Sequence, residues 1–164
     1  MKARTLLLLG LFLAAFSLLA TNGKVRASDD AQFKWVIVSS ASALAVDASS
    51  ITLTGTGTFA PNDPDEVTGG GTWAVSTGGT GTFQVTRLIR SDFTEPVSGS
   101  SIRGGVVFLG VAYSDGSRGV LTVNCRFPGT HPNVAEGATA SKGFVDYFNL
   151  QPHGTFFQQL SSED

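Results

Sequence analysis

Four polar side chains in the last third of the chain have types that could perform acid–base or metal chemistry. They are His131, Glu136, Asp146 and His153. A histidine beside a carboxylate can move protons, and a carboxylate facing the interior of a small domain would gain a raised pKa suited to a general base. We therefore take Glu136 and Asp146, together with His131, as the candidate catalytic residues. Both histidines adjoin prolines, which favours exposed loops, and no fixed spacing joins the set.

A second polar group is the segment Asn-Asp-Pro-Asp-Glu at residues 62–66. Three carboxylates on one loop are oxygen ligands of the kind that calcium prefers. The spacing is not that of an EF-hand, and the prolines at 61 and 64 are also typical of an ordinary turn between two strands. With one cysteine and two histidines in the chain, a disulfide framework and a cysteine-based zinc cluster are excluded. We predict no metal site and no cofactor.

The single cysteine is predicted to be a core residue. Alternation along residues 119–127 places Leu121, Val123, Cys125 and Phe127 on one face of a strand. No histidine, lysine or helix start lies near enough in sequence to stabilise a thiolate. The pattern indicates a buried, unreactive thiol rather than a nucleophile.

A short repeat suggests where a ligand could bind. The sequence Gly-Thr-Gly-Thr-Phe occurs at residues 55–59 and again at 79–83, without the continuation of a phosphate loop. In a strand the threonines would share one face and the glycines and phenylalanines the other. Inward glycines let a sheet bend sharply or leave room above it. The candidate ligand-binding residues are Gly57, Phe59, Trp73, Gly81 and Phe83.

The hydrophobic residues that would position these sites recur with a period of two, interrupted by Gly, Pro, Asn and Asp. This pattern predicts strands at 33–38, 51–59, 67–75, 80–89, 105–113, 119–127, 133–139, 144–149 and 155–160. Residues 39–48 fit a short helix, an irregular strand or a loop. Asp115-Gly116 predicts a tight turn between two of the strands.

Short antiparallel strands with inward glycines favour an all-β fold. We predict a small antiparallel β-barrel of about eight strands, with a β-sandwich as the alternative. The interior of a small barrel is either packed by side chains or holds one small ligand.

The N-terminus predicts export. Lys2 and Arg4 precede an uncharged apolar run at residues 6–20, which is the pattern of a secretory signal peptide and is short for a membrane span. Cleavage could follow Ala20 or Ala27. We take residues 1–27 as the signal peptide and 28–164 as one secreted β domain, without a membrane anchor after cleavage.

Removing that leader makes the protein acidic. Four basic residues leave with it, so seven basic and thirteen acidic residues remain, a net charge of −6. The sequence has no run of lysine or arginine, which disfavours nucleic acid and anionic membranes as partners. No particular oligomeric state is predicted.

Several stretches carry a family resemblance. They are residues 55–61 and 65–73 (GTGTFAP and DEVTGGGTW), 113–121 (YSDGSRGVL), 136–137 (EG) and 139–148 (TASKGFVDYF). These resemble a group of small secreted all-β proteins to which no activity is assigned, over most of the mature chain. The chain is more generally similar to dirigent and allene oxide cyclase-like barrels. Their catalytic motifs are not matched here, so this similarity implies only a small all-β barrel.

Two classes of function follow from these observations. The first is a secreted non-catalytic domain that holds a small apolar or amphipathic ligand inside, or presents its threonine face to a carbohydrate or another surface. The second is an enzyme that uses Glu136 or Asp146 with a histidine at the mouth of a barrel. We favour the first, because no nucleophile and base pair stands out. Ice binding by the threonine array is a further alternative.

Overall fold

A computed structural model describes residues 31–95 and 97–161, and the predicted signal peptide at 1–27 lies outside them. The described residues form strands and turns and contain no helix, so the predicted all-β class is confirmed. The strands are β1 (Phe33–Leu44), β2 (Ser50–Ala60), β3 (Asp63–Val67), β4 (Gly70–Val75), β5 (Thr80–Phe93), β6 (Ile102–Arg103), β7 (Gly105–Tyr113), β8 (Arg118–Cys125), β9 (Gly137–Lys142), β10 (Val145–Tyr147), β11 (Asn149–Gln151) and β12 (Thr155–Gln159).

The strands pair into one antiparallel sheet in the order β10-β9-β8-β7-β5-β4-β2-β1-β12-β6. In addition, β11 pairs with β1 and β3 pairs with β2. The ladder ends at β10 and β6, so hydrogen bonds between strands do not close the sheet. The prediction of a closed barrel of about eight strands is therefore not confirmed.

Three strands were not predicted as separate elements. Of the predicted strand 67–75, residues 70–75 form β4, whereas Val67 ends β3, whose residues 63–66 were predicted as part of a turn. Gly69 lies between the two strands with a φ of +117°, which is unfavourable for a side chain. The predicted strand 144–149 is replaced by the shorter β10 and β11, and the two-residue β6 was not predicted. Residues 39–44 continue β1 through an irregularity at Ser39, where φ is +61°, so the helix alternative for 39–48 is wrong.

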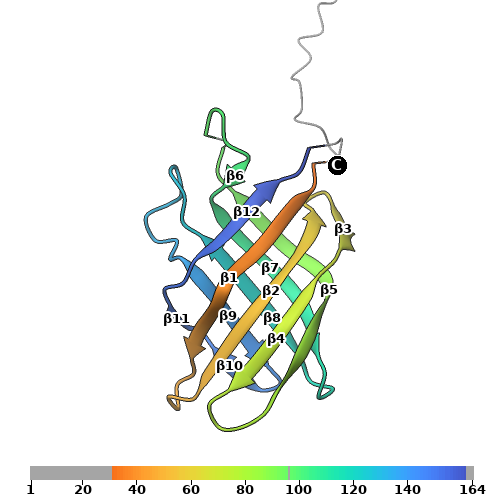
Figure 1. Cartoon of the computed structure of the whole chain (residues 1–164), viewed down its shortest axis with the longest axis vertical. Helices are drawn as coiled ribbons and strands as arrows, with labels where there is room; N and C mark the ends of the chain where they lie inside the picture. Colours follow the sequence, from red (N-terminus) through yellow and green to blue (C-terminus); the bar gives the residue numbers. More distant parts are fainter. Residues whose placement is uncertain (1–30, 96, 162–164) are drawn as a thin grey trace, which may run out of the picture.

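The sheet is strongly curled, so that β1, β2 and β4 lie in front of β7, β8 and β9 (Figure 1). Across the gap between its ends, β9 contacts β1 and β11, and β8 contacts β12. The described chain begins and ends at the same end of the sheet, where the Leu160 amide donates to the Gln32 carbonyl at 2.9 Å. We call this the terminal end and the opposite one the turn end.

Large rings paired with glycines fill the concave side of the sheet. Trp35 is the ladder partner of Gly57, and Trp73 is the partner of Gly81. Phe83 stands opposite Gly71 in the same way. Each glycine leaves space that the neighbouring ring occupies, and burying a side chain of this size stabilises the fold by about 1.5–3 kcal/mol. The sequence thus specifies the curvature and the packing with the same residues.

Four phenylalanines close the terminal end of this interior. They are Phe33, Phe59, Phe93 and Phe157, from β1, β2, β5 and β12. The ring centroids of Phe33 and Phe93 lie 4.8 Å apart, and those of Phe93 and Phe157 lie 5.1 Å apart. Such aromatic pairs contribute about 0.5–1.5 kcal/mol beyond their burial. These rings therefore form a stable apolar cluster that closes the terminal end of the interior.

Candidate functional site

The five residues predicted to bind a ligand all belong to the packed interior. Phe59, Trp73 and Phe83 are 1%, 5% and 2% exposed. A Cβ atom added to Gly57 would lie 2.7 Å from the Trp35 indole nitrogen, and one added to Gly81 would lie 2.9 Å from that of Trp73. At both glycines, therefore, an aromatic ring takes up the space in which a ligand could have been held.

Trp35 is the main interior residue that sequence reasoning missed. It is fully buried, and its ring contacts the positions where Gly55, Gly57 and Gly69 would carry a Cβ atom. Its indole nitrogen has no hydrogen-bond partner, so the residue contributes ring area rather than a polar contact. The alternation of Phe33, Trp35 and Ile37 was the signal that could have identified it.

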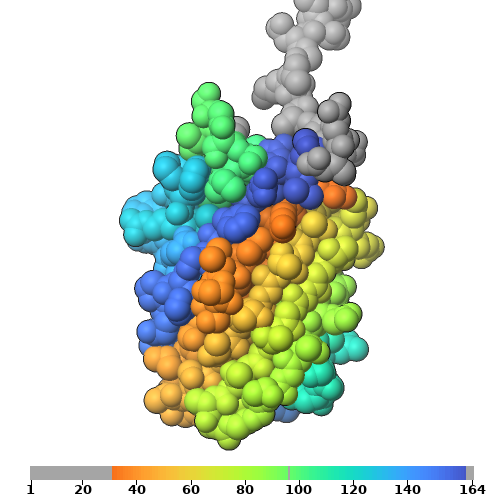
Figure 2. Space-filling view, viewed as in Figure 1, coloured from red at the N-terminus to blue at the C-terminus, as the bar shows by residue number. Residues whose placement is uncertain are grey.

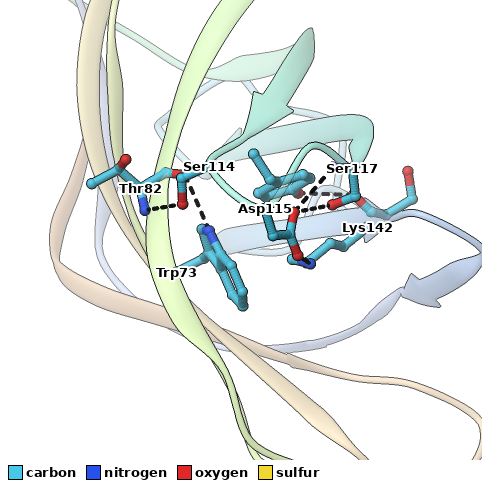
Figure 3. A network of polar contacts seen from close by, with 8 residues as sticks. Trp73, Thr82, Ser114, Asp115, Ser117 and Lys142 are labelled. Atoms are coloured by element: carbon cyan, nitrogen blue, oxygen red, sulfur yellow. Dashed lines mark hydrogen bonds and ion pairs between the residues drawn. The ribbon is translucent and has the colours of Figure 1, made fainter.

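A polar network closes the turn end of the interior (Figure 3). Lys142, at the end of β9, follows Ala138 and Ala140 on the inward face, and only 13% of its side chain is exposed. Its ammonium lies 4.1 Å from the centroid of the Trp73 ring and 5.3 Å from that of Tyr113, and it forms an ion pair with Asp115. A cation over aromatic faces is attracted by about 0.5–2 kcal/mol, more as it is desolvated.

The neighbours of this lysine are themselves fixed by hydrogen bonds. The Trp73 indole donates to the Thr82 carbonyl at 3.1 Å, and the Tyr113 hydroxyl donates to the Ser141 carbonyl at 2.8 Å. Burial, followed by the nearby Asp115 charge, raises the pKa of Tyr113 above its ordinary value. The Tyr113 hydroxyl stays protonated and the Lys142 ammonium is paired with Asp115, so neither group is available as a nucleophile. We call Trp73, Tyr113, Asp115 and Lys142 the lid, because they close the turn end of the interior.

The acid dependence of stability should reveal this lid. The hydrogen bond from Lys142, supported by Ser117, lowers the pKa of Asp115 to about 2. A carboxyl group whose pKa is lowered by folding stabilises the folded state at pH values above its ordinary pKa of 3.8. This stabilisation is lost as the pH falls toward 2. In Asp115→Asn, the urea midpoint should therefore fall less between pH 4.5 and pH 2 than in the wild type.

Asp146→Asn is the matched control, because it removes an exposed carboxylate that forms no ion pair among the described residues. Its urea midpoint should follow the wild-type curve. Equal acid sensitivity of Asp115→Asn and the wild type would show that the Lys142 ion pair contributes nothing.

A shallow pocket of about 540 Å³ lies away from the predicted ligand residues. It is lined by residues 97–101 and 159–161, beside the short strand β6 at the terminal end. The Arg103 guanidinium, from β6, donates to the Gln159 side chain at its border. None of Gly57, Phe59, Trp73, Gly81 and Phe83 lines this pocket.

Glu136 joins strands that the ladder leaves unpaired. One carboxylate oxygen accepts a hydrogen bond from the amide of Thr155 at 2.7 Å, and the other accepts from the amide of Arg126. The Thr155 hydroxyl lies 3.1 Å from the first oxygen, but its one proton has a closer acceptor in the Asn124 carbonyl. Thr155 begins β12 and Arg126 follows β8. The carboxylate thus bridges two strand ends through the backbone amides of Thr155 and Arg126.

The other candidate catalytic groups are dispersed over the surface. Asp146 is exposed on β10, and His131 and His153 are exposed in loops. The His131 ring accepts a hydrogen bond from the Asn133 amide at 3.3 Å, and His153 reaches Glu136 only through its main chain. No group of three or more metal-ligating side chains occurs among the described residues, and much of the acidic segment 62–66 forms β3.

Cys125 is buried, as predicted, and is 3% exposed. Burial, with a smaller effect from the Glu136 charge, raises the pKa of its thiol to about 11. A thiol that stays protonated at neutral pH is a poor nucleophile. The strand parity that placed it beside Leu121 and Val123 is confirmed.

The outer face of the sheet carries hydroxyl groups in register. Thr54 on β2, Thr72 on β4 and Thr82 on β5 are successive ladder partners. The hydroxyls of Thr54 and Thr72 lie 2.6 Å apart, and the exposed Thr82 continues the row on β5. We call Thr54, Thr72 and Thr82 the hydroxyl row.

Two further pairs flank the hydroxyl row. The hydroxyls of Ser42 and Thr52 lie 3.1 Å apart, and those of Thr58 and Thr68 lie 2.8 Å apart. Figure 2 shows β1, β2 and β4 as neighbouring diagonal ridges of one continuous surface. This face is the part of the molecule where many polar groups of one kind are both ordered and accessible.

No protein-family model, curated protein or solved structure shows a significant match to this chain. Within residues 31–95 and 97–161, no helix is long and apolar enough to cross a membrane.

Proposed function

We propose that this protein is an exported, non-catalytic binding domain that recognises carbohydrate through the outer face of its sheet. The hydroxyl row is the observation that carries the proposal. Each threonine hydroxyl can donate one hydrogen bond and accept two, so a hydroxyl pair that shares one proton keeps both donor and acceptor capacity for a ligand. Sugars present the same groups, and a sheet repeats them at regular intervals of about 5 Å between strands.

The packed concave side supports an external site. Rings lie over Gly57 and Gly81, the phenylalanine cluster fills the terminal end, and Lys142 fills the turn end. We propose that the domain behaves as a small barrel whose gap is closed by the contacts of β9 with β1 and β11. A rigid barrel of this kind would hold the hydroxyl row in one geometry and lower the entropic cost of binding.

The dispersed acid–base groups favour binding over catalysis. Two backbone amides donate to the Glu136 carboxylate, and Asp146 and His131 are exposed on other elements. General acid–base catalysis needs such groups to converge on one substrate position. The enzyme alternative therefore has less support than the binding one.

Replacing the paired threonines should weaken carbohydrate binding. Thr54→Val with Thr72→Val keeps the shape of the row but removes both hydroxyls, and the loss of two hydrogen bonds of about 1 kcal/mol each should lower affinity at least tenfold. Binding would be measured on an array of neutral and charged polysaccharides, followed by calorimetry on those retained. Thr139→Val, on the outer face of β9, is the matched control.

Unchanged affinity in the double variant would exclude the hydroxyl row as the site. Failure of the wild type to bind any polysaccharide would overturn the proposal itself. Thermal hysteresis measured on the same samples would identify ice as the ligand instead.

A further inference from the structure

We infer that the carbohydrate is anionic and carboxylated, and that Arg87, Arg90 and Arg118 bind it on the outer face of β5, β7 and β8. This inference rests on the proposed function, because the same outer surface continues from the hydroxyl row across β5. We call these three residues the arginine track.

Two irregularities in β5 bring two of the arginines to one face. The register with β7 shifts between Val85 and Arg87 and again between Leu88 and Arg90. Residues three apart in a regular strand point to opposite faces, but a bulge inserts one residue and restores the alignment. As a result, Arg87 pairs with Gly110 and Arg90 with Phe108, two residues that share the outer face of β7.

The third arginine flanks β7 from the other side. Arg118 on β8 pairs with Ala112, the next outward residue of β7. From strand geometry, neighbouring rows lie about 7 Å apart along β7, and the two flanking strands lie about 10 Å apart across it. The arginine track therefore surrounds one short stretch of β7, from Phe108 to Ala112.

The guanidinium groups are partly positioned before any ligand arrives. A Cβ atom added to Gly110 would lie 2.9 Å from Arg87 Cγ and 3.2 Å from its Nε, so the arginine stem lies across the glycine. Arg90 Nη2 forms an ion pair with Asp92 Oδ2 at 3.0 Å. An arginine stem packed on the sheet loses less conformational freedom when its planar head binds.

Positive charge is concentrated on the outer face of β5, β7 and β8. On the outer surface of the three strands, Asp92 is the one acidic residue that the structure describes. Arg87 and Arg118 form no ion pair within the described residues. The predicted mature chain is nevertheless acidic, with a net charge of −6. A positive face on an acidic protein attracts an anion and orients the molecule toward it.

The chemistry of this face fits a carboxylated sugar polymer. Guanidinium groups bind carboxylates through two parallel hydrogen bonds, which a lysine cannot reproduce. The half-buried Phe108 offers an apolar surface between the arginines, and Thr122 is its partner on β8. Apolar area, hydroxyls and fixed cations together match a chain of sugar rings that carries carboxylates.

The test compares two polymers with the same sugar backbone, one with free carboxylates and one with methyl esters in their place. Polygalacturonate carries free carboxylates, and its fully methyl-esterified form has the same backbone without them. We expect the wild type to bind polygalacturonate at least tenfold more tightly at low salt, and this preference should shrink as salt is added. The triple variant Arg87→Gln, Arg90→Gln and Arg118→Gln should bind both polymers equally.

Lys34→Gln is the matched control, because it removes an exposed cation from the outer face of β1. It should retain the preference within about twofold, whereas Arg87→Lys should lose part of it although the charge is kept. Far-ultraviolet circular dichroism and the urea midpoint would verify that each variant is folded. All substituted side chains are exposed, so folding should be preserved.

The outcomes separate this inference from the proposed function. A wild type that binds both polymers equally, through Thr54 and Thr72, would overturn the arginine track and leave the proposed function standing. A preference that survives in Thr54→Val with Thr72→Val but disappears in the arginine triple variant would support the track without the hydroxyl row. Equal losses in Lys34→Gln and the triple variant would overturn the track. Tighter binding of an acidic peptide or DNA oligonucleotide would overturn the assignment to carbohydrate.

Discussion

Gly57→Ala is expected to lower the free energy of unfolding by about 3 kcal/mol, the upper end of the usual cost of overpacking. The new Cβ atom would lie 2.2 Å from the Thr68 carbonyl oxygen and 2.6 Å from the Gly69 Cα atom. Both obstacles are backbone, so relief requires β2 or the loop before β4 to move. Gly57→Leu should be worse, because the Trp35 ring takes up the remaining space. Urea denaturation followed by tryptophan fluorescence measures the change.

Gly154→Ala provides the comparison for this experiment. Its added Cβ atom would meet Val38 at 3.5 Å, an ordinary contact, and its backbone is not left-handed. The free energy of unfolding should therefore change by less than about 0.5 kcal/mol. If both alanine variants were equally stable, the close approach of β2 to the loop before β4 would be wrong, and room for a ligand beside Trp35 would have to be reconsidered.

Glu136→Ala should be the second strongly destabilising change, by about 2–3 kcal/mol. The substitution leaves the Thr155 amide, on a residue that is 5% exposed, without an acceptor, and an unpaired buried donor costs about 1–3 kcal/mol. It also removes one of the links between the end of β8 and the start of β12, which no ladder joins, and leaves the hydrogen bond from the Thr155 hydroxyl to the Asn124 carbonyl. Urea denaturation at pH 7 measures the loss.

Glu136→Gln separates the two contributions. The amide oxygen can still accept from Thr155, but the new amino group would face the Arg126 amide, so about half of the loss should remain. If Glu136→Ala instead retained wild-type stability, the carboxylate would be free of a structural role and the enzyme alternative would regain support.

Sequence patterns predicted the regular parts of this fold for a clear physical reason. Alternation placed Leu121, Val123 and Cys125 inward because β8 is uninterrupted, and the Asp115-Gly116 turn formed because Gly116 supplies the required positive φ of +88°. Where a strand has no irregularity, the position of a residue in the alternating sequence pattern gives the face on which its side chain lies.

Irregular backbone is also the reason that the rest could not be predicted. Extending the alternation of β5 beyond Val85 would have turned Arg87 inward and Leu88 outward, whereas the bulge reverses both. The face on which Glu136 lies could not be predicted either, because Gly137 beside it has a φ of +138°, which interrupts the regular alternation of a strand. Lys142 was missed because a lysine is normally placed in solvent, and only the alternation through Ala138 and Ala140 indicated otherwise.

The positions of the first and last described residues determine how the domain responds to a pulling force. Because β1 and β12 are antiparallel neighbours, and the start of β1 lies beside the end of β12, tension applied at Ala31 and Ser161 acts across their ladder. Hydrogen bonds between antiparallel strands run perpendicular to the strands. They would therefore open one at a time from the bond between Leu160 and Gln32 inward, and the domain would unzip at low force rather than resist shear.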